Sequence, residues 1–422
     1  MNAAHPAAVP SAPQRVPRGL VALAFLAVLL DGFDMTVLAL LVPGLARDWG
    51  LAPADFTGPL VITNVGAVLG YLASSALIAR TGARRTLLIG VAVFAIGTVA
   101  TAAVLPAESL AALGALRLAT GLGLGVVLPA AVSLVTTHSP ARRRETVSVL
   151  VTLGLASGAT LAGLLGGRLA ARIGADGLFW IAGLCPLVLL AVLWWRLPRT
   201  VPAAATTAEN TPNARVGALF APATRTRTVL IWAFSFFIFI ASYTLQSWLP
   251  TLLTDYGFTP EQAPLGVACT SIGGVLGGLT LAPMATRIGI NRALVVMPLV
   301  GAVCLTAVAL APVSGAVLLA VLSIGAAGIT ASQIGQLTLA VALYPAASRA
   351  TGVSWAAALG RIGSIVGPGA AGVLLMLSLD GRRIMLATMV PVVAALLCAL
   401  AMTARPAGRA AETADPSPAR AS

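Results

Sequence analysis

Long apolar runs, separated by short polar stretches, follow one another along the whole chain. Each run covers close to 20 residues or more, the length that an α-helix needs to cross the hydrocarbon core of a bilayer. The first set covers residues 20–42, 57–79, 85–105, 108–137, 146–168 and 178–197. The second set covers residues 228–253, 263–285, 293–311, 314–344, 351–377 and 383–404. The pattern predicts an all-α polytopic membrane protein with twelve transmembrane helices in two six-helix bundles.

The stretch between the two sets is rich in Ala, Thr and Pro, as flexible linkers are. Of the 422 residues, 58% are hydrophobic and only 9% are charged, which leaves too little polar surface for a soluble protein. The predicted organisation is an N-terminal tail (1–17), an N-terminal bundle (18–198), a linker (199–227), a C-terminal bundle (228–404) and a tail (405–422).

The net charge of +13 comes from 26 arginines, and the chain contains no lysine. In a soluble protein this charge would suggest a nucleic-acid partner. Here the arginines cluster in the short polar stretches, with nineteen on the side of the N-terminus and five on the other side. Because cytoplasmic loops carry the excess of basic residues, both tails and the linker are predicted to be cytoplasmic. No nucleic-acid partner is expected.

An internal repeat supports the division into halves. Arg80 and Arg287 follow the second apolar run of their halves, 207 residues apart. The pattern from Pro140 to Thr146 recurs from Pro345 to Thr351, at an offset of 205 residues. Two similar offsets at equivalent boundaries indicate parallel six-helix repeats.

Two aspartates, Asp31 and Asp34, lie in the middle of the first apolar run. An unpaired charge at that depth costs about 2.5 to 3.5 kcal/mol on insertion scales, so acids are rarely kept there for packing. At a spacing of three residues the two side chains share one helix face, and Gly32 between them permits close approach of a neighbouring helix. We interpret both as proton-carrying carboxylates. The alternative is a static ion pair that fixes helix packing.

Arg117, in the 108–137 run, is the expected partner of this pair. Counted from the predicted outer helix ends, Asp34 and Arg117 lie at depths that agree to about 1.5 Å on the rise of an α-helix. We therefore expect an ion pair between them, with Asp31 one turn deeper. Making and breaking such a pair changes the proton affinity of the carboxylate. A purely neutralising role for the arginine is the alternative.

Arg361 lies ten residues into the 351–377 run, in the opposite half and near the depth of Asp31. Its guanidinium is suited to bind a substrate carboxylate through two hydrogen bonds, and the alternative is bonding to backbone carbonyls near Gly360 and Gly363. Five further polar residues either line a substrate site or join helices to one another. They are Asn64, Tyr243, Gln246, Gln333 and Gln336. We expect Trp248, near the predicted outer boundary, to be an interfacial anchor.

Several motifs resemble the major facilitator superfamily. The loops after the 57–79 and 263–285 runs resemble its signature G-x-L-A-D-R-x-G-R-R, and the segment from Arg117 to Gly125 is similar to its signature of an arginine followed by spaced glycines. Finer matches point to the aromatic acid:proton symporter family within that superfamily. They are Asp31-Gly-Phe-Asp34, Ser247-Trp-Leu-Pro250, Tyr344-Pro345 leading to Arg349-Ala-Thr-Gly352, and Gly360-Arg361-Ile-Gly363-Ser364 with Gly367-Pro368.

The resemblance implies a carrier that imports a small aromatic carboxylate of the benzoate, hydroxybenzoate or phenylpropionate type by proton symport with alternating access. It implies a monomer in the bacterial cytoplasmic (inner) membrane, with an organic anion and protons as partners and the proton gradient, not a cofactor, as energy source. The implied gating residues are Arg80, Gly82, Arg84, Arg85, Arg287 and Gly289. The acid that usually pairs with arginine in these loops is replaced by Ala79 and Thr286.

Other functions remain as alternatives. Carriers of nicotinate and other small organic acids share parts of these motifs, and a proton-linked exporter is the nearest rival. A membrane enzyme would need a nucleophile or paired His and acids at one interface, and no such group is visible. The four cysteines are single within apolar runs, and the two histidines, His5 and His138, are far apart, so no metal site is expected.

Overall fold

The computed structural model describes residues 16–197, 216–222, 224–310, 315–344 and 346–404. Most of the predicted tails and much of the predicted linker lie outside these ranges. The described residues are helical apart from short turns and contain eleven helices that are long and apolar enough to cross a membrane. The predicted class, an all-α polytopic membrane protein, is therefore confirmed.

The first half contains five helices by residue range. They are α1 (Arg18–Asp48), α2 (Thr57–Thr81), α3 (Ala83–Val104), α4 (Leu110–Thr137) and α5 (Arg144–Arg196), with a short 3₁₀ turn, η1 (Pro53–Phe56), before α2. The second half contains six. They are α6 (Arg225–Thr254), α7 (Leu265–Ile288), α8 (Ile290–Leu310), α9 (Gly315–Leu343), α10 (Ala346–Met376) and α11 (Gly381–Thr403).

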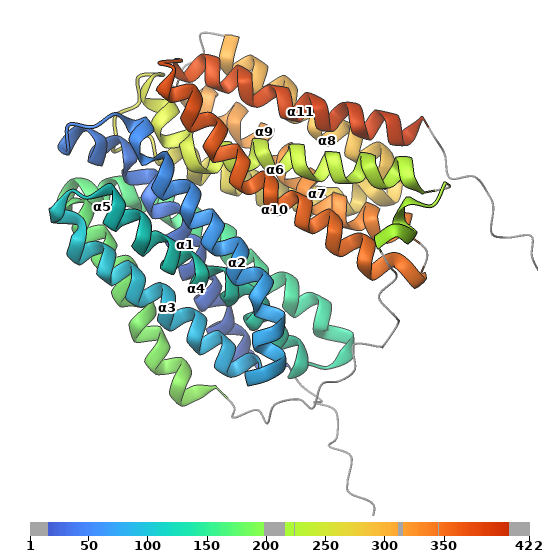
Figure 1. The fold of residues 1–422 in the computed structure, drawn as a ribbon, viewed down its shortest axis with the longest axis horizontal. Helices are drawn as coiled ribbons and strands as arrows, with labels where there is room; N and C mark the ends of the chain where they lie inside the picture. Colours follow the sequence, from blue (N-terminus) through green and yellow to red (C-terminus); the bar gives the residue numbers. More distant parts are fainter. Residues whose placement is uncertain (1–15, 198–215, 223, 311–314, 345, 405–422) are drawn as a thin grey trace, which may run out of the picture.

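The α5 helix differs from the prediction, which placed two separate helices at 146–168 and 178–197. Instead, one element of 53 residues is interrupted at Gly174, where φ is 79° and ψ is 171°. A straight helix of that length would measure about 80 Å, against about 30 Å for the bilayer core. Glycine populates positive φ without a steric penalty, so one residue suffices for the reversal and no loop separates the two arms (Figure 1).

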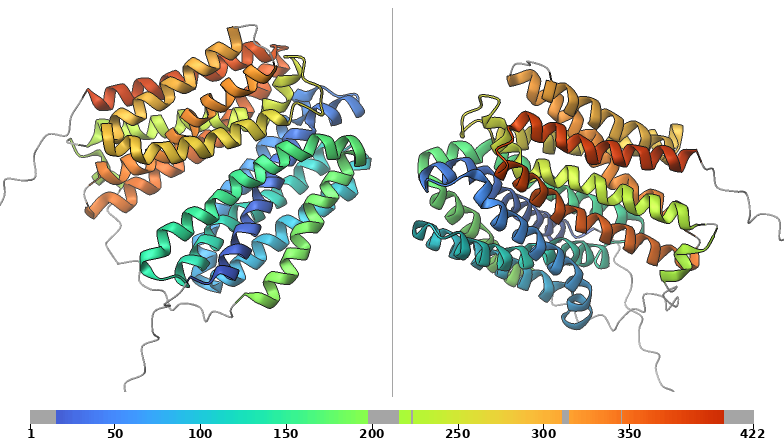
Figure 2. Two further views of the ribbon diagram at one scale, coloured as in Figure 1. Left: turned by 180° about the vertical axis from the view of Figure 1, so that it is seen from behind. Right: turned by 45° about the horizontal axis from the view of Figure 1, so that its top comes forward.

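The helices of each half pack in the same order. In the first half α1 packs on α5, while α2 and α3 both pack on α4. In the second half α6 packs on α10, while α7 and α8 both pack on α9. This correspondence matches the internal repeat found in the sequence. Helices α1–α5 form one group and α6–α11 another, and the two groups lie side by side in both views of Figure 2.

The charged loop residues divide the molecule into two ends. The arginine-rich end carries basic residues at helix termini: Arg18, Arg80, Arg84, Arg85, Arg196, Arg225, Arg287 and Arg292. The opposite end carries the described loop acids: Asp48, Asp55, Glu108, Asp176, Asp255, Glu261 and Asp380. The two helix groups meet towards the opposite end and spread apart towards the arginine-rich end (Figure 1).

Small residues bring the two groups together at the opposite end. A Cβ added at Gly372 of α10 would collide with Thr57 of α2, and one added at Gly369 would lie 3.6 Å from Cγ2 of Val61. We call this line of contacts the α2–α10 seam. A Cβ at Gly163 of α5 would likewise lie 2.7 Å from the carbonyl oxygen of Pro264, just before α7. Backbone-to-backbone packing of this kind is typical of helix interfaces in membranes.

Candidate functional site

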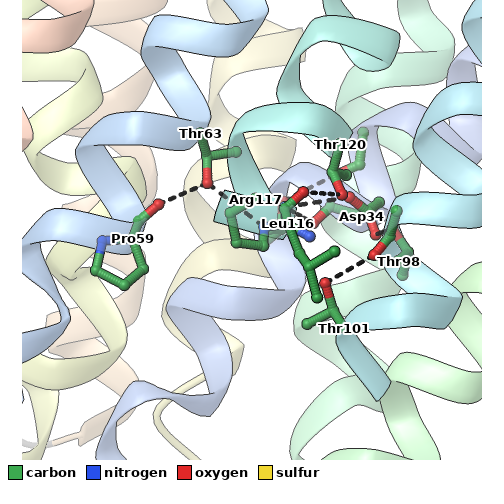
Figure 3. A network of polar contacts seen from close by, with 11 residues as sticks. Asp34, Pro59, Thr63, Thr98, Thr101, Leu116, Arg117 and Thr120 are labelled. Carbon is green, nitrogen blue, oxygen red and sulfur yellow. Dashed lines mark hydrogen bonds and ion pairs between the residues drawn. The ribbon is translucent and has the colours of Figure 1, made fainter. Parts of the chain in front are cut away.

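An ion pair joins α1 and α4 in the interior of the first helix group. Nη2 of Arg117 lies 3.2 Å from Oδ2 of Asp34, and both side chains are completely buried (Figure 3). The pairing expected from helix depth is therefore present. Removing one member of such a pair leaves an uncompensated buried charge, which costs about 3 to 5 kcal/mol.

Hydroxyl groups from two further helices complete this ion pair. The Thr98 hydroxyl of α3 donates to Oδ1 of Asp34 at 2.7 Å, and Nε of Arg117 donates to the Thr63 hydroxyl of α2 at 3.4 Å. Thr63 in turn donates to the backbone carbonyl of Pro59. Four helices thus converge on one carboxylate and one guanidinium (Figure 3). The sequence did not single out Thr63 or Thr98, because nothing distinguishes them from the many other threonines in apolar runs.

A cavity of about 20 Å³ lies beside the ion pair. Its walls come from α1, α2, α4 and α6: Met35, Leu38, Ala39, Leu60, Thr63, Asn64, Arg117, Gln246 and Ser247. Two predicted site residues, Asn64 and Gln246, are therefore neighbours of Arg117. Among the described residues, Nη1 of Arg117 has no hydrogen-bond partner. A space of this size is enough for about one water molecule and too small for an aromatic acid.

Asp31 is also buried, with 3% of its surface exposed. The backbone of α5 lies against Gly32, the residue after Asp31. A Cβ added at Gly32 would come within 2.7 Å of Cα of Leu155. This close approach presses α5 onto α1 beside the two aspartates. The charge of Arg361, from the second helix group, lies within Coulombic range of Asp31. The expected similarity in depth of Asp31 and Arg361 agrees with this proximity.

The Arg361 guanidinium contacts two tyrosines. Nη1 lies 3.4 Å from the Tyr243 hydroxyl of α6, and Cζ lies 4.6 Å from the ring centroid of Tyr71 on α2. Within the described residues, the recorded contacts of the guanidinium are with these two tyrosines and not with the carbonyls near Gly360 and Gly363. Tyr71 was missed in the sequence, although it is the one tyrosine in the 57–79 run. Phe239 stacks on Tyr243 with a centroid distance of 5.9 Å, which extends the aromatic surface.

The predicted glutamines of α9 join helices to one another. Gln333 accepts a hydrogen bond from Ser242 at 3.1 Å, and Gln336 accepts one from Ser235, both across to α6. Asn64 donates to the Leu60 carbonyl of its own helix at 3.0 Å. The two glutamine contacts correspond to the alternative in which polar side chains join helices to one another, whereas the Asn64 contact lies within one helix.

The expectation that Trp248 is an interfacial anchor is wrong. Its side chain is fully buried, and Nε1 donates to the carbonyl oxygen of Pro368 in α10 at 2.9 Å. An indole N–H removed from water requires an acceptor, and the adjoining helix α10 supplies one. The residue therefore links α6 to α10 inside the second helix group.

The signature loops adopt tight turns. Gly82 and Gly289, with φ of 81° and 85°, allow the chain to reverse between α2 and α3 and between α7 and α8. Arg84 donates to the carbonyls of Trp194 at 2.8 Å and Leu197 at 3.2 Å, so it caps the C-terminal end of α5.

The other predicted gating arginines are exposed. They are Arg80, Arg85 and Arg287. None of the three ion pairs found within the described ranges involves a signature-loop arginine.

Comparisons with known proteins agree with this architecture. A family model for the Major Facilitator Superfamily matches residues 24–368. The chain is 32% identical to the gallate transporter of Pseudomonas putida, over 90% of this chain and 91% of that protein. It is 29% identical to the 4-hydroxybenzoate transporter PcaK of Pseudomonas aeruginosa, over 88% of this chain and 89% of that protein.

A solved structure has the same fold. The xylose transporter XylE from Escherichia coli, in its inward-open conformation, superposes with a TM-score of 0.73 at 15% identity, over 92% of this chain and 95% of that one. The family match covers most of the helical part of the chain, and the sequence relatives cover nearly all of it. The chain is therefore a transporter and not an enzyme, and it belongs to the Major Facilitator Superfamily.

Proposed function

We propose that this chain imports a small aromatic carboxylate together with at least one proton, by exposing a midplane site to one side of the membrane and then to the other. The buried Asp34–Arg117 ion pair, with the second buried carboxylate Asp31 one turn away on α1, carries the proposal. The two sequence relatives are transporters of gallate and 4-hydroxybenzoate, both of which are hydroxylated benzoates. A benzoate, a hydroxybenzoate or a phenylpropionate is accordingly the proposed substrate class.

The proposed architecture has twelve spans, with the two arms of α5 counted separately on either side of Gly174. They form two six-helix bundles joined by the linker at 199–227. The excess of described arginines at one end over the other supports a cytoplasmic location for the arginine-rich end. The protein would act as a monomer in the bacterial inner membrane, with the proton gradient as its energy source and no cofactor.

Proton coupling would use the two carboxylates of α1. A carboxylate that exchanges an arginine partner for water or substrate changes its proton affinity, so a change in exposure is converted into uptake or release of a proton. The Asp34 carboxylate accepts hydrogen bonds from the Thr98 hydroxyl and from the Arg117 guanidinium in the present conformation. Movement of α1 against α4 would separate Asp34 from Arg117.

Substrate binding would use Arg361. A planar guanidinium matches a carboxylate through two parallel N–H donors, and Tyr243 with Phe239 provides an aromatic surface on the same helix group. Gln246 and Asn64, beside the cavity near Arg117, are candidates for orienting a ring hydroxyl. Gln333 and Gln336 are weaker candidates for substrate binding, because their amide oxygens already accept hydrogen bonds from serines of α6.

Uptake into proteoliposomes tests the function. The panel is gallate, 4-hydroxybenzoate, 3-phenylpropionate, nicotinate and succinate, each with and without an imposed inward proton gradient. Accumulation of gallate, 4-hydroxybenzoate or 3-phenylpropionate only with the gradient is the expected result. Accumulation of succinate alone would refute the substrate class, uptake of nicotinate alone would favour a nicotinate carrier, and gradient-driven efflux from loaded vesicles would favour an exporter.

The role of Arg361 is tested by binding to detergent-purified protein. Arg361→Ala removes charge-assisted hydrogen bonds worth about 1.5 to 3 kcal/mol, so the affinity for 4-hydroxybenzoate should fall roughly tenfold or more. Arg361→Lys keeps the positive charge but lacks the planar guanidinium with its parallel N–H donors. This variant should therefore fold as the wild type does but bind 4-hydroxybenzoate as weakly as Arg361→Ala does. An unchanged affinity in Arg361→Ala would refute the carboxylate clamp.

A further inference from the structure

The contact between Tyr71 and Arg361 continues the α2–α10 seam. The two helices run antiparallel, and the seam pairs Thr57 with Gly372 and Val61 with Gly369. Tyr71 lies ten residues beyond Val61, and Arg361 lies eight residues before Gly369, which correspond to about 15 and 12 Å on the helical rise. The Tyr71–Arg361 contact is therefore in register with the two contacts at the end where the helix groups meet.

The character of the contact changes along this seam. At Gly372 a Cβ would collide with Thr57, and at Gly369 it would be in van der Waals contact with Val61, whereas Tyr71 and Arg361 meet through two long side chains. This is the direction in which the two helix groups spread apart (Figure 1). Tyr71 is 38% exposed, although its ring faces a cation from the other helix group. The contact thus bridges the two groups where they begin to separate.

Among the described residues, Tyr243 is the side chain that accepts a hydrogen bond from the Arg361 guanidinium, which has five N–H donors. Guanidinium groups commonly stack on aromatic faces, and with Cζ 4.6 Å from the Tyr71 centroid Arg361 is well within the range of a cation–π interaction. The in-plane N–H groups of a guanidinium point away from such a ring, and Tyr243 takes one of them. An arginine side chain has about 2 kcal/mol of rotamer entropy to lose on binding, so fixing it beforehand improves affinity.

We propose that Tyr71 is a positioning residue: its ring, on the first helix group, fixes the Arg361 guanidinium of the second group in the orientation that receives the substrate carboxylate. The inference rests on the proposed role of Arg361 as the carboxylate clamp. It makes the clamp a shared element, because the cation and the Tyr71 ring that it contacts come from different helix groups. Substrate affinity then depends on how closely α2 and α10 approach.

Binding to detergent-purified protein tests this, with 4-hydroxybenzoate as probe and 4-hydroxybenzamide as its carboxylate-free counterpart. Tyr71→Leu should weaken 4-hydroxybenzoate binding about fivefold, the equivalent of about 1 kcal/mol, and leave 4-hydroxybenzamide binding unchanged. Tyr71→Phe retains the ring and should restore the affinity. Leu72→Ala is the matched control, because Leu72 is the next residue of α2 and is 59% exposed, and it should bind both probes as wild type does.

A double-mutant cycle separates positioning from direct contact with substrate. In the Arg361→Ala background, Tyr71→Leu should cause no further loss of 4-hydroxybenzoate affinity, because the ring acts through the guanidinium. A loss that persists in that background, or an equal loss for 4-hydroxybenzamide, would overturn the proposal and make Tyr71 a wall of the site. If Arg361→Ala alone leaves affinity unchanged, the clamp itself fails. If it lowers affinity while Tyr71→Leu does not, only the present inference fails.

A ligand-free measurement completes the test. The thermal unfolding midpoints of Tyr71→Leu, Arg361→Ala and the double variant should be non-additive, with the double variant close to the less stable single variant. Additive midpoints would contradict the contact between the two helix groups, whichever substrate the protein carries.

Discussion

The Asp34–Arg117 ion pair makes a strong prediction about stability and transport together. Arg117→Met removes the guanidinium and leaves the Asp34 carboxylate fully buried with the Thr98 hydroxyl as its remaining partner. Breaking a buried pair in this way costs about 3 to 5 kcal/mol. The double variant Asp34→Leu/Arg117→Met removes both charges and places apolar groups of similar size in the same space, a change that is neutral or stabilising in other buried pairs.

The assay is thermal unfolding of the detergent-purified protein, followed by uptake in proteoliposomes. We expect Arg117→Met to lower the unfolding midpoint by about 5 °C or more and the double variant to recover most of that loss. Gradient-driven uptake should be absent from both, since neither retains a complete carboxylate–guanidinium pair. Thr98→Val is the graded control: it removes one hydrogen bond to Asp34 and should cost about 1 to 3 kcal/mol while transport is reduced and not abolished.

Two outcomes would refute this reasoning. A double variant as unstable as Arg117→Met would mean that the packing, and not the uncompensated charge, causes the loss. A double variant that is stable and still accumulates substrate when an inward proton gradient is imposed would mean that the pair is a static support. In that case Asp34 is not part of proton coupling.

The remaining predictions concern neighbouring positions. Asp31→Asn should abolish gradient-driven accumulation while counterflow of preloaded substrate survives, because an amide does not exchange protons at physiological pH; wild-type accumulation would exclude Asp31 as a proton carrier. Gly32→Val should prevent correct packing of α5 and reduce the yield of folded protein in size-exclusion chromatography, because its side chain would collide with the Leu155 backbone; normal yield and stability would show that α1 and α5 can separate there. Ala79→Asp should create a contact with a nearby basic group such as Arg85 and lower the labelling of cysteines introduced at the arginine-rich end, whereas unchanged labelling would place the gate elsewhere.

The sequence predicted the fold class, the helix positions and the main ion pair, because each depends on strong local signals. Apolar runs of membrane length specify helices directly, and a charge in such a run requires a partner at the same depth. Asp34 and Arg117 met this requirement, because they lie at similar predicted depths in two apolar runs of the same half. The arms of α5 were expected as separate helices because a stretch that contains Arg168, Arg172 and Gly174 divides the two apolar runs, but a single residue with positive φ makes the reversal.

The parts that were missed depend on contacts between distant segments. Thr63 and Thr98 become partners of the ion pair only when α2 and α3 pack on α4, and a threonine has the same sequence signal whether it bonds to its own helix or to another. Trp248 lies near the predicted outer boundary, where tryptophans are common. Only the packing of α10 on α6 shows that its indole is buried. Tyr71 could be recognised only from the seam between the two helix groups.

The four charged side chains in the middle of the helices have an electrical consequence. Asp31 and Asp34 carry two negative charges when ionised, and Arg117 and Arg361 carry two positive charges, so with both carboxylates ionised these four charges sum to zero without cargo. Loading one monoanion with one proton leaves that sum at zero. A membrane potential does about 2.3 kcal/mol of work per elementary charge per 100 mV, and it would do no net work on either the empty or the loaded form. Equal stoichiometry would therefore make uptake respond to the pH difference alone, whereas a second proton would bring the voltage into the cycle and raise the attainable accumulation.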